Sequence, residues 1–292
     1  MLRRLCITIS ENDSNRVLKY VLRDRLGVSA SVLTELKKSP RSIFCNGLEV
    51  FANHRVMAGD RVEIVLKDET SPNIVPVDIP LDIIYEDDDI LAVNKPHSMP
   101  THPSQNHHDD TLANAVMGYY RECKFTFRVI TRLDRDTSGI VLIAKNKLSA
   151  AILTQQMTSG NIEKEYVAIC HGVLNPVSGI IDVPIRRAEN STMLREVNLL
   201  GKKAITQYHT EYSNGEYSIV RLKPITGRTH QIRVHLSYMG CPIFGDGMYG
   251  SAIVGERTRL HCCSISFVHP INHNKIKLEA ELPEDMKEFT IY

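Results

Sequence analysis

The sequence predicts a protein of mixed α and β structure, with a small unit at the N-terminus and a larger unit built around one substantial sheet. Three observations predict this. Residues 14–67 combine two helical patterns with short strand-like runs, and residues 68–80 are acidic with three prolines. Beyond residue 80, strand-like runs are interrupted by only two helical patterns. This is not the regular alternation of strands and helices that builds a parallel sheet.

The first unit should begin with two helices. Apolar residues recur at helical spacing in residues 14–27, where Ser14 can cap the start and Gly27 can end the helix. A second, shorter helix follows up to Pro40, with Ser29 or Ser31 as its cap. Two strands come next, with turns at Asn46-Gly47 and Gly59-Asp60; they are SIFC (42–45) and RVEIVL (61–66).

These patterns divide the chain. We expect a compact unit in residues 1–67, with its core in about 14–67, then a linker at 68–80 and a large domain in 81–292. In the large domain the predicted strands are residues 83–86, 90–96, 140–145, 165–174, 217–225 and 276–282, and the predicted helices are 111–123 and 148–160.

Composition indicates a cytoplasmic protein with no membrane partner. No apolar run approaches the roughly 20 residues that span a bilayer, and the N-terminus lacks the apolar core of a signal peptide. The seven cysteines form no CxxC pair, so neither a disulfide framework nor a zinc ribbon is expected.

The net charge is only +1, but it is unevenly distributed. Residues 1–67 hold twelve Lys/Arg against seven Asp/Glu, and residues 68–94 hold eight acidic residues and no Lys/Arg. Basic residues again outnumber acidic ones in 121–147 and 221–259. Separate basic patches on a nearly neutral chain can offer a local site for a polyanion, although any one of them can equally be a solvated face.

The stretch TRLDRDTSGIVLIAKN (131–146) places four charged residues directly before a buried strand. A turn at the end of a core strand is a rigid mount for a functional side chain. Asp134 has Arg132 and Arg135 beside it, and nearby cations favour the ionised carboxylate, which suits a nucleophile or an electrostatic anchor. The alternative is that Asp134 or Asp136 only caps the turn, and the spacing does not choose between the two.

Two further stretches carry chemistry. KPITGRTHQIRVHL (223–236) concentrates side chains that bind anions, because arginine offers a planar charged fork for carboxylate or phosphate. The spacing of His230 and His235 is not that of a metal motif, so we expect no metal site. Tyr166 lies in a predicted strand, where a half-buried core role is the simpler alternative. FGDGMYG (244–250) lacks nucleotide-binding spacings, so we expect no cofactor.

Together these stretches resemble the RluA-type pseudouridine synthases from about residue 81 to the C-terminus. The matching motifs occur in the order of the family: AVNKP (92–96), RLDRDTSG (132–139), KEY (164–166), GKKAITQY (201–208), LKPITGRTHQIRVHL (222–236) and GCPIFGDGMYG (240–250). Residues 14–67 resemble the small RNA-binding module with the αL motif that is often fused in front of such synthases. The resemblance implies an α+β pseudouridine synthase fold with a mixed, largely antiparallel central sheet.

The resemblance also implies roles for individual residues. The catalytic aspartate falls on Asp134, the active-site tyrosine on Tyr166, and the arginine that pairs with the catalytic carboxylate on Arg233. Arg132 matches the residue that enters the RNA helix where the target base leaves. The family usually has histidine before RLD, and this chain has Thr131, which puts details of RNA contact in question.

The remaining candidates for RNA contact belong to both units. In the large domain they are Arg135, Arg228 and His230. In the small unit they are Lys37, Lys38 and Arg41.

The function that follows is isomerisation of specific uridines in RNA to pseudouridine. Large-subunit ribosomal RNA is the commonest target of the family, and transfer RNA is the second possibility. We expect a monomer that needs no cofactor. Two alternatives remain open: a non-catalytic RNA-binding or ribosome-assembly protein of the same fold, and a hydrolase that uses Asp136 as a second carboxylate.

Overall fold

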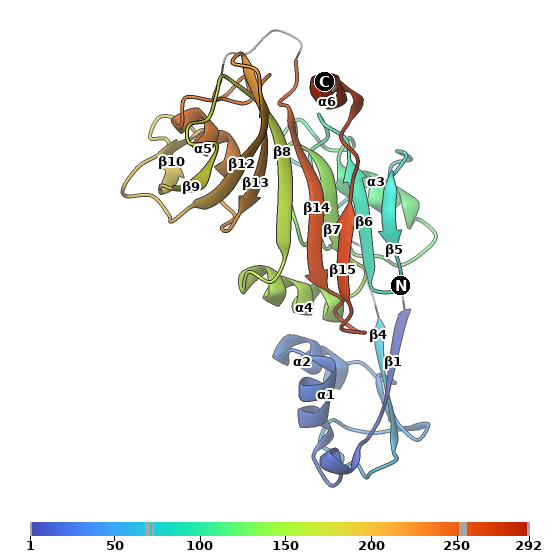
Figure 1. Ribbon diagram of the computed structural model, residues 1–292. Helices are drawn as coiled ribbons and strands as arrows, with labels where there is room; N and C mark the ends of the chain where they lie inside the picture. The colour runs from blue at the N-terminus through green and yellow to red at the C-terminus, as the bar shows by residue number, and fades with distance from the viewer. Residues whose placement is uncertain (1, 68–70, 72, 251–255, 291–292) are drawn as a thin grey trace.

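The computed structural model describes residues 2–67, 71, 73–250 and 256–290, and Figure 1 shows them as an N-terminal unit below a larger C-terminal unit. Residues 68–70 and 72 of the predicted linker lie outside the described residues. We call residues 2–67 the N-terminal unit and the rest the C-terminal unit. Within the described part of the chain, no helix has the length and apolar character that crossing a membrane requires.

The N-terminal unit packs two helices against a small antiparallel sheet, with strand order β1-β4-β2-β3 among its described residues. The elements are β1 (Leu2–Thr8), a 3₁₀ turn (Glu11–Asp13), α1 (Leu18–Leu26), α2 (Ala30–Lys38), β2 (Ile43–Cys45), β3 (Leu48–Glu49) and β4 (Arg61–Lys67). The sequence did not predict β1, because Leu5 is its only buried residue and the apolar alternation of a half-buried strand is therefore weak.

The caps of the two helices differ from one another. Gly27 ends α1 in the left-handed conformation, with φ +65°, as the sequence predicted. Ser14 does not cap α1, which begins only at Leu18; its hydroxyl instead accepts a hydrogen bond from the Ala58 N–H at 3.2 Å. Ser29 caps α2 by accepting from the Val32 N–H.

The C-terminal unit is built on a mixed sheet that the described residues show as nine strands. Its strands are β5 (Ile83–Glu86), β6 (Ile90–Lys95), β7 (Ser138–Ala144), β8 (Glu163–His171), β9 (Ser178–Asp182), β12 (Ile205–Ser213), β13 (Tyr217–Pro224), β14 (Leu260–Val268) and β15 (Lys275–Glu279). The helices are α3 (Leu112–Tyr119), α4 (Lys147–Thr158), α5 (Gln231–Tyr238) and α6 (Glu284–Lys287), the last continuing as a 3₁₀ turn (Glu288–Thr290). A separate ribbon pairs β10 (Ile185–Arg187) with β11 (Arg195–Val197).

The predicted fold class is confirmed: the sheet is mixed and largely antiparallel. Its strand order is β5-β6-β7-β14-β8-β13-β12-β9, and β15 pairs with the second half of β14. Every pair is antiparallel except β7 with β14. All six predicted strands are present, whereas β9, β12, β14 and the helix α5 were not predicted.

Gly139 makes the parallel pairing of β7 and β14 possible. It lies opposite Cys262 in the register and has φ +113°, a conformation that side-chain-bearing residues rarely adopt. A Cβ at this position would lie 2.3 Å from the carbonyl oxygen of Cys262. The glycine that the sequence places between the charged turn and the buried strand is therefore required by the close approach of two backbones.

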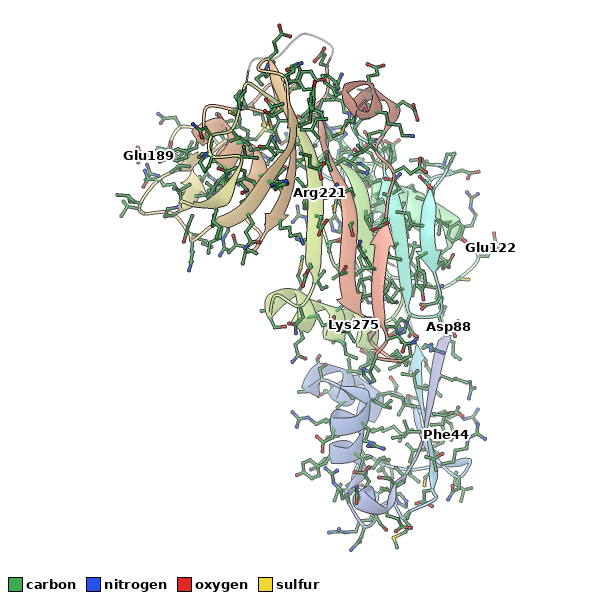
Figure 2. All side chains as sticks on the ribbon, viewed as in Figure 1. Phe44, Asp88, Glu122, Glu189, Arg221 and Lys275 are labelled. Atoms are coloured by element: carbon green, nitrogen blue, oxygen red, sulfur yellow. The ribbon has the colours of Figure 1, made fainter. Side chains whose placement is uncertain are left out.

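The two units share apolar packing. The buried core of the N-terminal unit includes Leu148 of α4, which is fully buried, and Ile152 packs against the same cluster. Arg3 of β1 reaches the turn between β5 and β6, where its guanidinium pairs with the carboxylate of Asp89 at 2.8 Å and with that of Asp88 at 3.0 Å. Figure 2 labels Asp88 at this junction.

Candidate active site

The charged turn at residues 131–137 is held by a buried lysine. The amino group of Lys95 donates hydrogen bonds to the carbonyl oxygens of Pro96, Met99 and Arg135 at 2.8, 2.8 and 3.1 Å, and burial lowers its pKa to about 7. The hydroxyl of Thr101 donates to the Leu133 carbonyl at 2.8 Å. The backbone on both sides of Asp134 is therefore fixed by Lys95, at the end of β6, and by Thr101, in the segment that follows it.

Thr131 belongs to the core of this arrangement. It is 1% exposed, and its hydroxyl oxygen accepts a hydrogen bond from the Leu142 N–H at 2.9 Å. Its side chain thus supports the turn from inside the protein. Since Thr131 is buried, it does not itself reach the protein surface.

The turn forms one wall of a cleft of about 320 Å³. The other walls include the start of β8 and residues 224–233, which join β13 to α5 and form the first turn of that helix. The described residues that line the cleft include most of the predicted site: Arg132, Asp134, Tyr166, Arg228, His230 and Arg233. Three stretches that are distant in the sequence therefore converge on one cavity.

Asp134 and Asp136 are in different surroundings. Asp134 lines the cleft, and it is the only carboxylate among the described lining residues. Asp136 lies outside it and pairs with its neighbour Arg135, whose Nε donates to Oδ1 at 3.0 Å. The structure thereby separates two aspartates that the sequence spacing left equivalent.

Arg233 connects Asp134 to a second, buried carboxylate. Its Nε and Nη2 donate to Oδ2 and Oδ1 of Asp246, both at 2.7 Å, and its Nη1 lies 3.6 Å from Oδ2 of Asp134. Arg233 is 4% exposed and Asp246 is fully buried. Sequence reasoning missed Asp246, because FGDGMYG was judged for nucleotide-binding spacing and counted among the family motifs without a role for any one of its residues.

His230 approaches Asp134 from the other side. Its Nε2 lies 3.9 Å from Oδ2 of Asp134, and its Nδ1 lies 2.7 Å from the hydroxyl oxygen of Tyr249. Burial lowers the pKa of His230 below its ordinary value, although the nearby Asp134 carboxylate acts in the opposite direction. Tyr249 also belongs to the FGDGMYG stretch and was missed for the same reason as Asp246.

The floor of the cleft carries Tyr166 and Lys164 on β8. Tyr166 is 6% exposed, and burial raises the pKa of its phenol well above the ordinary value, so it is a neutral side chain at physiological pH. Lys164 is half-buried at the cleft, and burial lowers its pKa. The face of the Tyr166 ring, with the Lys164 side chain beside it, can hold a flat, polar ring of a ligand.

The candidates for RNA contact occupy two regions. Arg132 and Arg228 are exposed at the cleft, whereas Arg135 is exposed outside it. Lys37, Lys38 and Arg41 are exposed on the N-terminal unit, at the end of α2 and just after it, and do not belong to the cleft.

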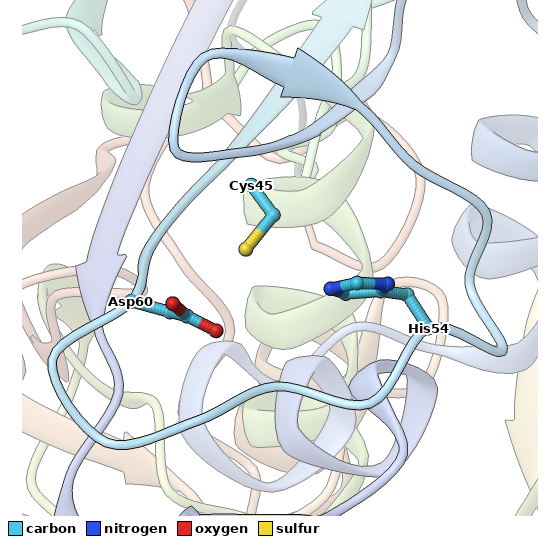
Figure 3. Close-up of side chains that lie close together, drawn as sticks. All are labelled: Cys45, His54 and Asp60. Atoms are coloured by element: carbon cyan, nitrogen blue, oxygen red, sulfur yellow. The ribbon is translucent and has the colours of Figure 1, made fainter.

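One group of possible metal ligands lies in the N-terminal unit, away from the cleft. Figure 3 shows Cys45, His54 and Asp60 pointing toward one another in the N-terminal unit, with one ligand atom of each within 4.8 Å of the others. Both oxygens of Asp60 already accept hydrogen bonds, from the Asn46 amide at 2.8 Å and from the Met57 N–H at 2.7 Å. These bonds give the carboxylate a structural role in the turn.

The two histidines of the 223–236 stretch do not form a pair of ligands. His235 is fully buried, and its ring nitrogens contact the Thr206 hydroxyl at 2.9 Å and the Val183 carbonyl at 3.1 Å. It is a hydrogen-bonded core residue, whereas His230 faces the cleft.

Comparison with known proteins identifies the family of the chain. Residues 89–238 match the family model described as RNA pseudouridylate synthase. The chain is 36% identical over 266 residues to RNA pseudouridine synthase YjbO of Bacillus subtilis (strain 168), covering 89% of this chain and 94% of that protein. It is 33% identical over 293 residues to Ribosomal large subunit pseudouridine synthase D of Vibrio parahaemolyticus, covering 94% of this chain and 85% of that protein. The solved structure of Human RNA Pseudouridylate Synthase Domain Containing 1 is similar, with a TM-score of 0.58 at 27% identity, covering 69% of this chain and 83% of that chain.

Proposed function

The chain belongs to the RNA pseudouridylate synthase family as an RluA-type member and is an RNA pseudouridine synthase, and from this premise we propose that it converts specific uridines of large-subunit ribosomal RNA through the carboxylate of Asp134. The choice of RNA is supported by relatives named for the large ribosomal subunit. The choice of residue is supported by one observation: Asp134 is the only carboxylate among the described residues that line the cleft, and a guanidinium faces it.

The reaction changes the atom through which the uracil base is bonded to the ribose, and the atomic composition of the RNA stays the same. The glycosidic bond between ribose and the uracil nitrogen breaks, the base turns while bound, and its carbon-5 bonds to the ribose. The proton on carbon-5 leaves and the nitrogen ends protonated, so no cosubstrate is consumed. Positive charge develops on the ribose, and an ionised carboxylate stabilises it, attacks the sugar carbon, or removes a sugar proton.

The other cleft residues have separate tasks in this proposal. Arg233 aims Asp134, since its Nη1 lies 3.6 Å from Oδ2 of that carboxylate. Tyr166 stacks on the uracil and stands beside the carbon-5 proton. Arg132 occupies the space that the extruded nucleotide leaves, which offsets part of an unstacking cost of a few kcal/mol.

We further propose that residues 1–67 are an RNA-binding module of the αL type, which contacts phosphates of a neighbouring RNA element. Lys37, Lys38 and Arg41 are its candidate contacts, and their exposure supports this. The enzyme would act in the cytoplasm as a monomer. Transfer RNA is the second candidate substrate.

Two experiments test the proposal. Pseudouridine is mapped at nucleotide resolution in total RNA from cells with and without the protein; a lost site in large-subunit ribosomal RNA supports the proposed substrate, and a site lost only in transfer RNA contradicts it. Asp134→Asn should abolish conversion while RNA affinity falls less than tenfold, because one neutral amide replaces the charge that stabilises the ribose. Full turnover by this variant would remove Asp134 from the mechanism.

The hydrolase alternative predicts a different product. A glycosidase of the usual type flanks the scissile bond with two carboxylates, whereas the described lining of this cleft contains Asp134 alone. Release of free uracil from RNA would favour hydrolysis, and retention of the isomerised base in the RNA chain excludes it.

A further inference from the structure

We propose that residues 245–250 position the carboxylate of Asp134 through two arms, one from Asp246 through Arg233 and one from Tyr249 through His230, so that Oδ2 is held and Oδ1 is left to act on the ribose. This inference rests on the proposed role of Asp134. It assigns a role to GDGMYG (245–250). This stretch is not among the described residues that line the cleft, and it takes no direct part in the proposed chemistry.

The first arm fixes the plane of a guanidinium. Asp246 takes the Nε and Nη2 edge of Arg233 in a fully buried, two-bonded pair, and Oδ1 of Asp246 also accepts from the N–H groups of Met248 and Tyr249 at 3.0 and 3.2 Å. A forked pair of this kind sets orientation as well as charge. The remaining amino group, Nη1, is thereby directed at Oδ2 of Asp134.

The second arm fixes the proton on an imidazole. The hydroxyl oxygen of Tyr249 accepts a hydrogen bond from the Arg195 N–H at 2.9 Å, so its own proton is available for Nδ1 of His230 at 2.7 Å. A neutral imidazole that accepts at Nδ1 carries its proton on Nε2. That nitrogen lies 3.9 Å from Oδ2 of Asp134.

The backbone at His230 supports a functional placement. His230 precedes α5 with φ 57° and ψ 19°, in the left-handed region. A residue other than glycine holds this conformation when its surroundings impose it, and such residues concentrate at functional sites. The ring is held edge-on to Tyr249, with ring centres 5.5 Å apart.

The two arms converge on one oxygen. Both Nη1 of Arg233 and Nε2 of His230 face Oδ2, at distances longer than a hydrogen bond, and within the described part of the chain no hydrogen bond is donated to Oδ1 of Asp134. In active sites without substrate, donors often lie this far from their acceptors, and they move closer when the substrate binds. Oδ1 faces neither of these two nitrogens at such a distance, and it is the oxygen that we assign to the ribose.

The arrangement predicts a dependence on pH. The charged groups that act on His230 are Asp134, Arg233, Arg195 and Asp246. The hydroxyl of Tyr249 favours the neutral ring, because it occupies Nδ1 as a donor. In Tyr249→Phe this bond is lost and Nδ1 becomes free to bind a proton, so the pKa of His230 rises. A cationic His230 binds Oδ2 more strongly and lowers the reactivity of Asp134.

The test uses the full chain, single-turnover conversion of a defined RNA that contains the target uridine, and RNA affinity measured in parallel. Asp246→Asn should lower the rate about 100-fold, the usual scale for losing one preorganised group. Tyr249→Phe should lower it about tenfold and move the acid limb of the rate profile to higher pH. The RNA dissociation constant should stay within threefold for both. Asp110→Asn and Tyr238→Phe, exposed residues outside the cleft, are the matched controls.

The outcomes separate the two levels of proposal. If Asp134→Asn converts uridine normally, the proposed function of Asp134 fails. If Asp134→Asn is inactive while Tyr249→Phe keeps the wild-type rate and pH profile, only the two-armed positioning is overturned. A rate that falls in Asp246→Asn or Tyr249→Phe only in proportion to RNA affinity also overturns it. Tyr249→Phe removes one hydroxyl and preserves the ring, so it keeps the test open if Asp246→Asn fails to fold.

Discussion

The Nη1 atom of Arg233 lies 3.6 Å from Oδ2 of Asp134, on the one edge of the guanidinium that Asp246 leaves open. A single side chain thus faces two carboxylates with different tasks. One is fully buried and fixes the plane, and the other is partly exposed at the cleft. The geometry uses the shape of arginine as well as its charge.

Arg233→Lys should therefore fail to replace arginine. An ammonium offers no fixed fork, so it cannot hold both oxygens of Asp246 and still face Asp134. We expect the single-turnover rate to fall at least about 100-fold, with RNA affinity changed less than threefold. Arg221→Lys, on a guanidinium that pairs with Glu211 away from the cleft, is the control. A rate within threefold of wild type for Arg233→Lys would contradict the geometric requirement.

Gly139→Ala should destabilise the protein by about 3 kcal/mol or more, because its Cβ would meet the Cys262 carbonyl in a backbone conformation that already disfavours alanine. Gly160→Ala is the matched control, since Gly160 also has positive φ but nothing within 4 Å of the added Cβ. Gly160→Ala should lower the free energy of unfolding by about 1 kcal/mol. Denaturant unfolding of the two variants gives the comparison, and equal losses would show that the contact with Cys262 is unimportant.

His261 should make the folded state sensitive to acid. It is 1% exposed, and burial lowers its pKa from 6.5 to about 4. At pH 7 the ring is neutral in both the folded and the unfolded chain. Below pH 6.5 the unfolded chain binds a proton that the folded protein does not, so stability falls as the pH falls toward 4, by about 3 kcal/mol in total.

His261→Asn tests this sign. Asparagine keeps a polar group near Ser138, whose hydroxyl contacts Nδ1 of His261 at 2.9 Å, and it cannot titrate. The unfolding free energy, measured from pH 7 to pH 4, should fall less steeply in the variant than in the wild type. Parallel curves would mean that His261 protonates equally easily in both states.

Replacing Lys37, Lys38 and Arg41 with alanine together should weaken RNA binding and flatten its salt dependence. Each phosphate contact contributes about 0.7–0.9 to the slope of log affinity against log salt, so three lost contacts should reduce the slope by about 2 to 3. Lys275→Ala, on the β14–β15 side of the C-terminal unit, is a control for the loss of surface charge. An unchanged slope would count against RNA contact by the N-terminal unit.

These substitutions test the N-terminal unit better than its removal does. Deleting residues 1–67 would expose Leu148 and Ile152, which pack into the core of that unit. A truncated chain could then lose activity through aggregation. The three exposed side chains can be removed without disturbing this packing.

The strands of the central sheet could be predicted where they are continuous apolar runs. β6 and β7 are almost entirely buried, so their sequences ILAVNK and SGIVLIA identify them directly. β12, ITQYHTEYS, contains mostly polar residues and could not be found this way, because only alternate positions face the core. The helix α5 was obscured by the three cationic or imidazole side chains of THQIRVH (229–235), which drew attention to chemistry rather than to periodicity.

Only some residues of the candidate site could be predicted from the sequence. Motif resemblance selected Asp134, Tyr166 and Arg233, which the fold brings to one cleft. Asp246 and Lys95 could not be selected, since their roles depend on burial and on partners more than ten residues away in the chain. A charge that is fully buried looks the same in a sequence as one in solvent.

The packing of Leu148 into the core of the N-terminal unit has a geometric consequence. Because Arg3 also pairs with Asp88 and Asp89 at the same junction, the two units cannot pivot without exposing apolar surface and breaking an ion pair. Under the proposal that the N-terminal unit binds RNA, we expect the enzyme to select a uridine by its distance from the RNA element that this unit contacts, as well as by its local sequence.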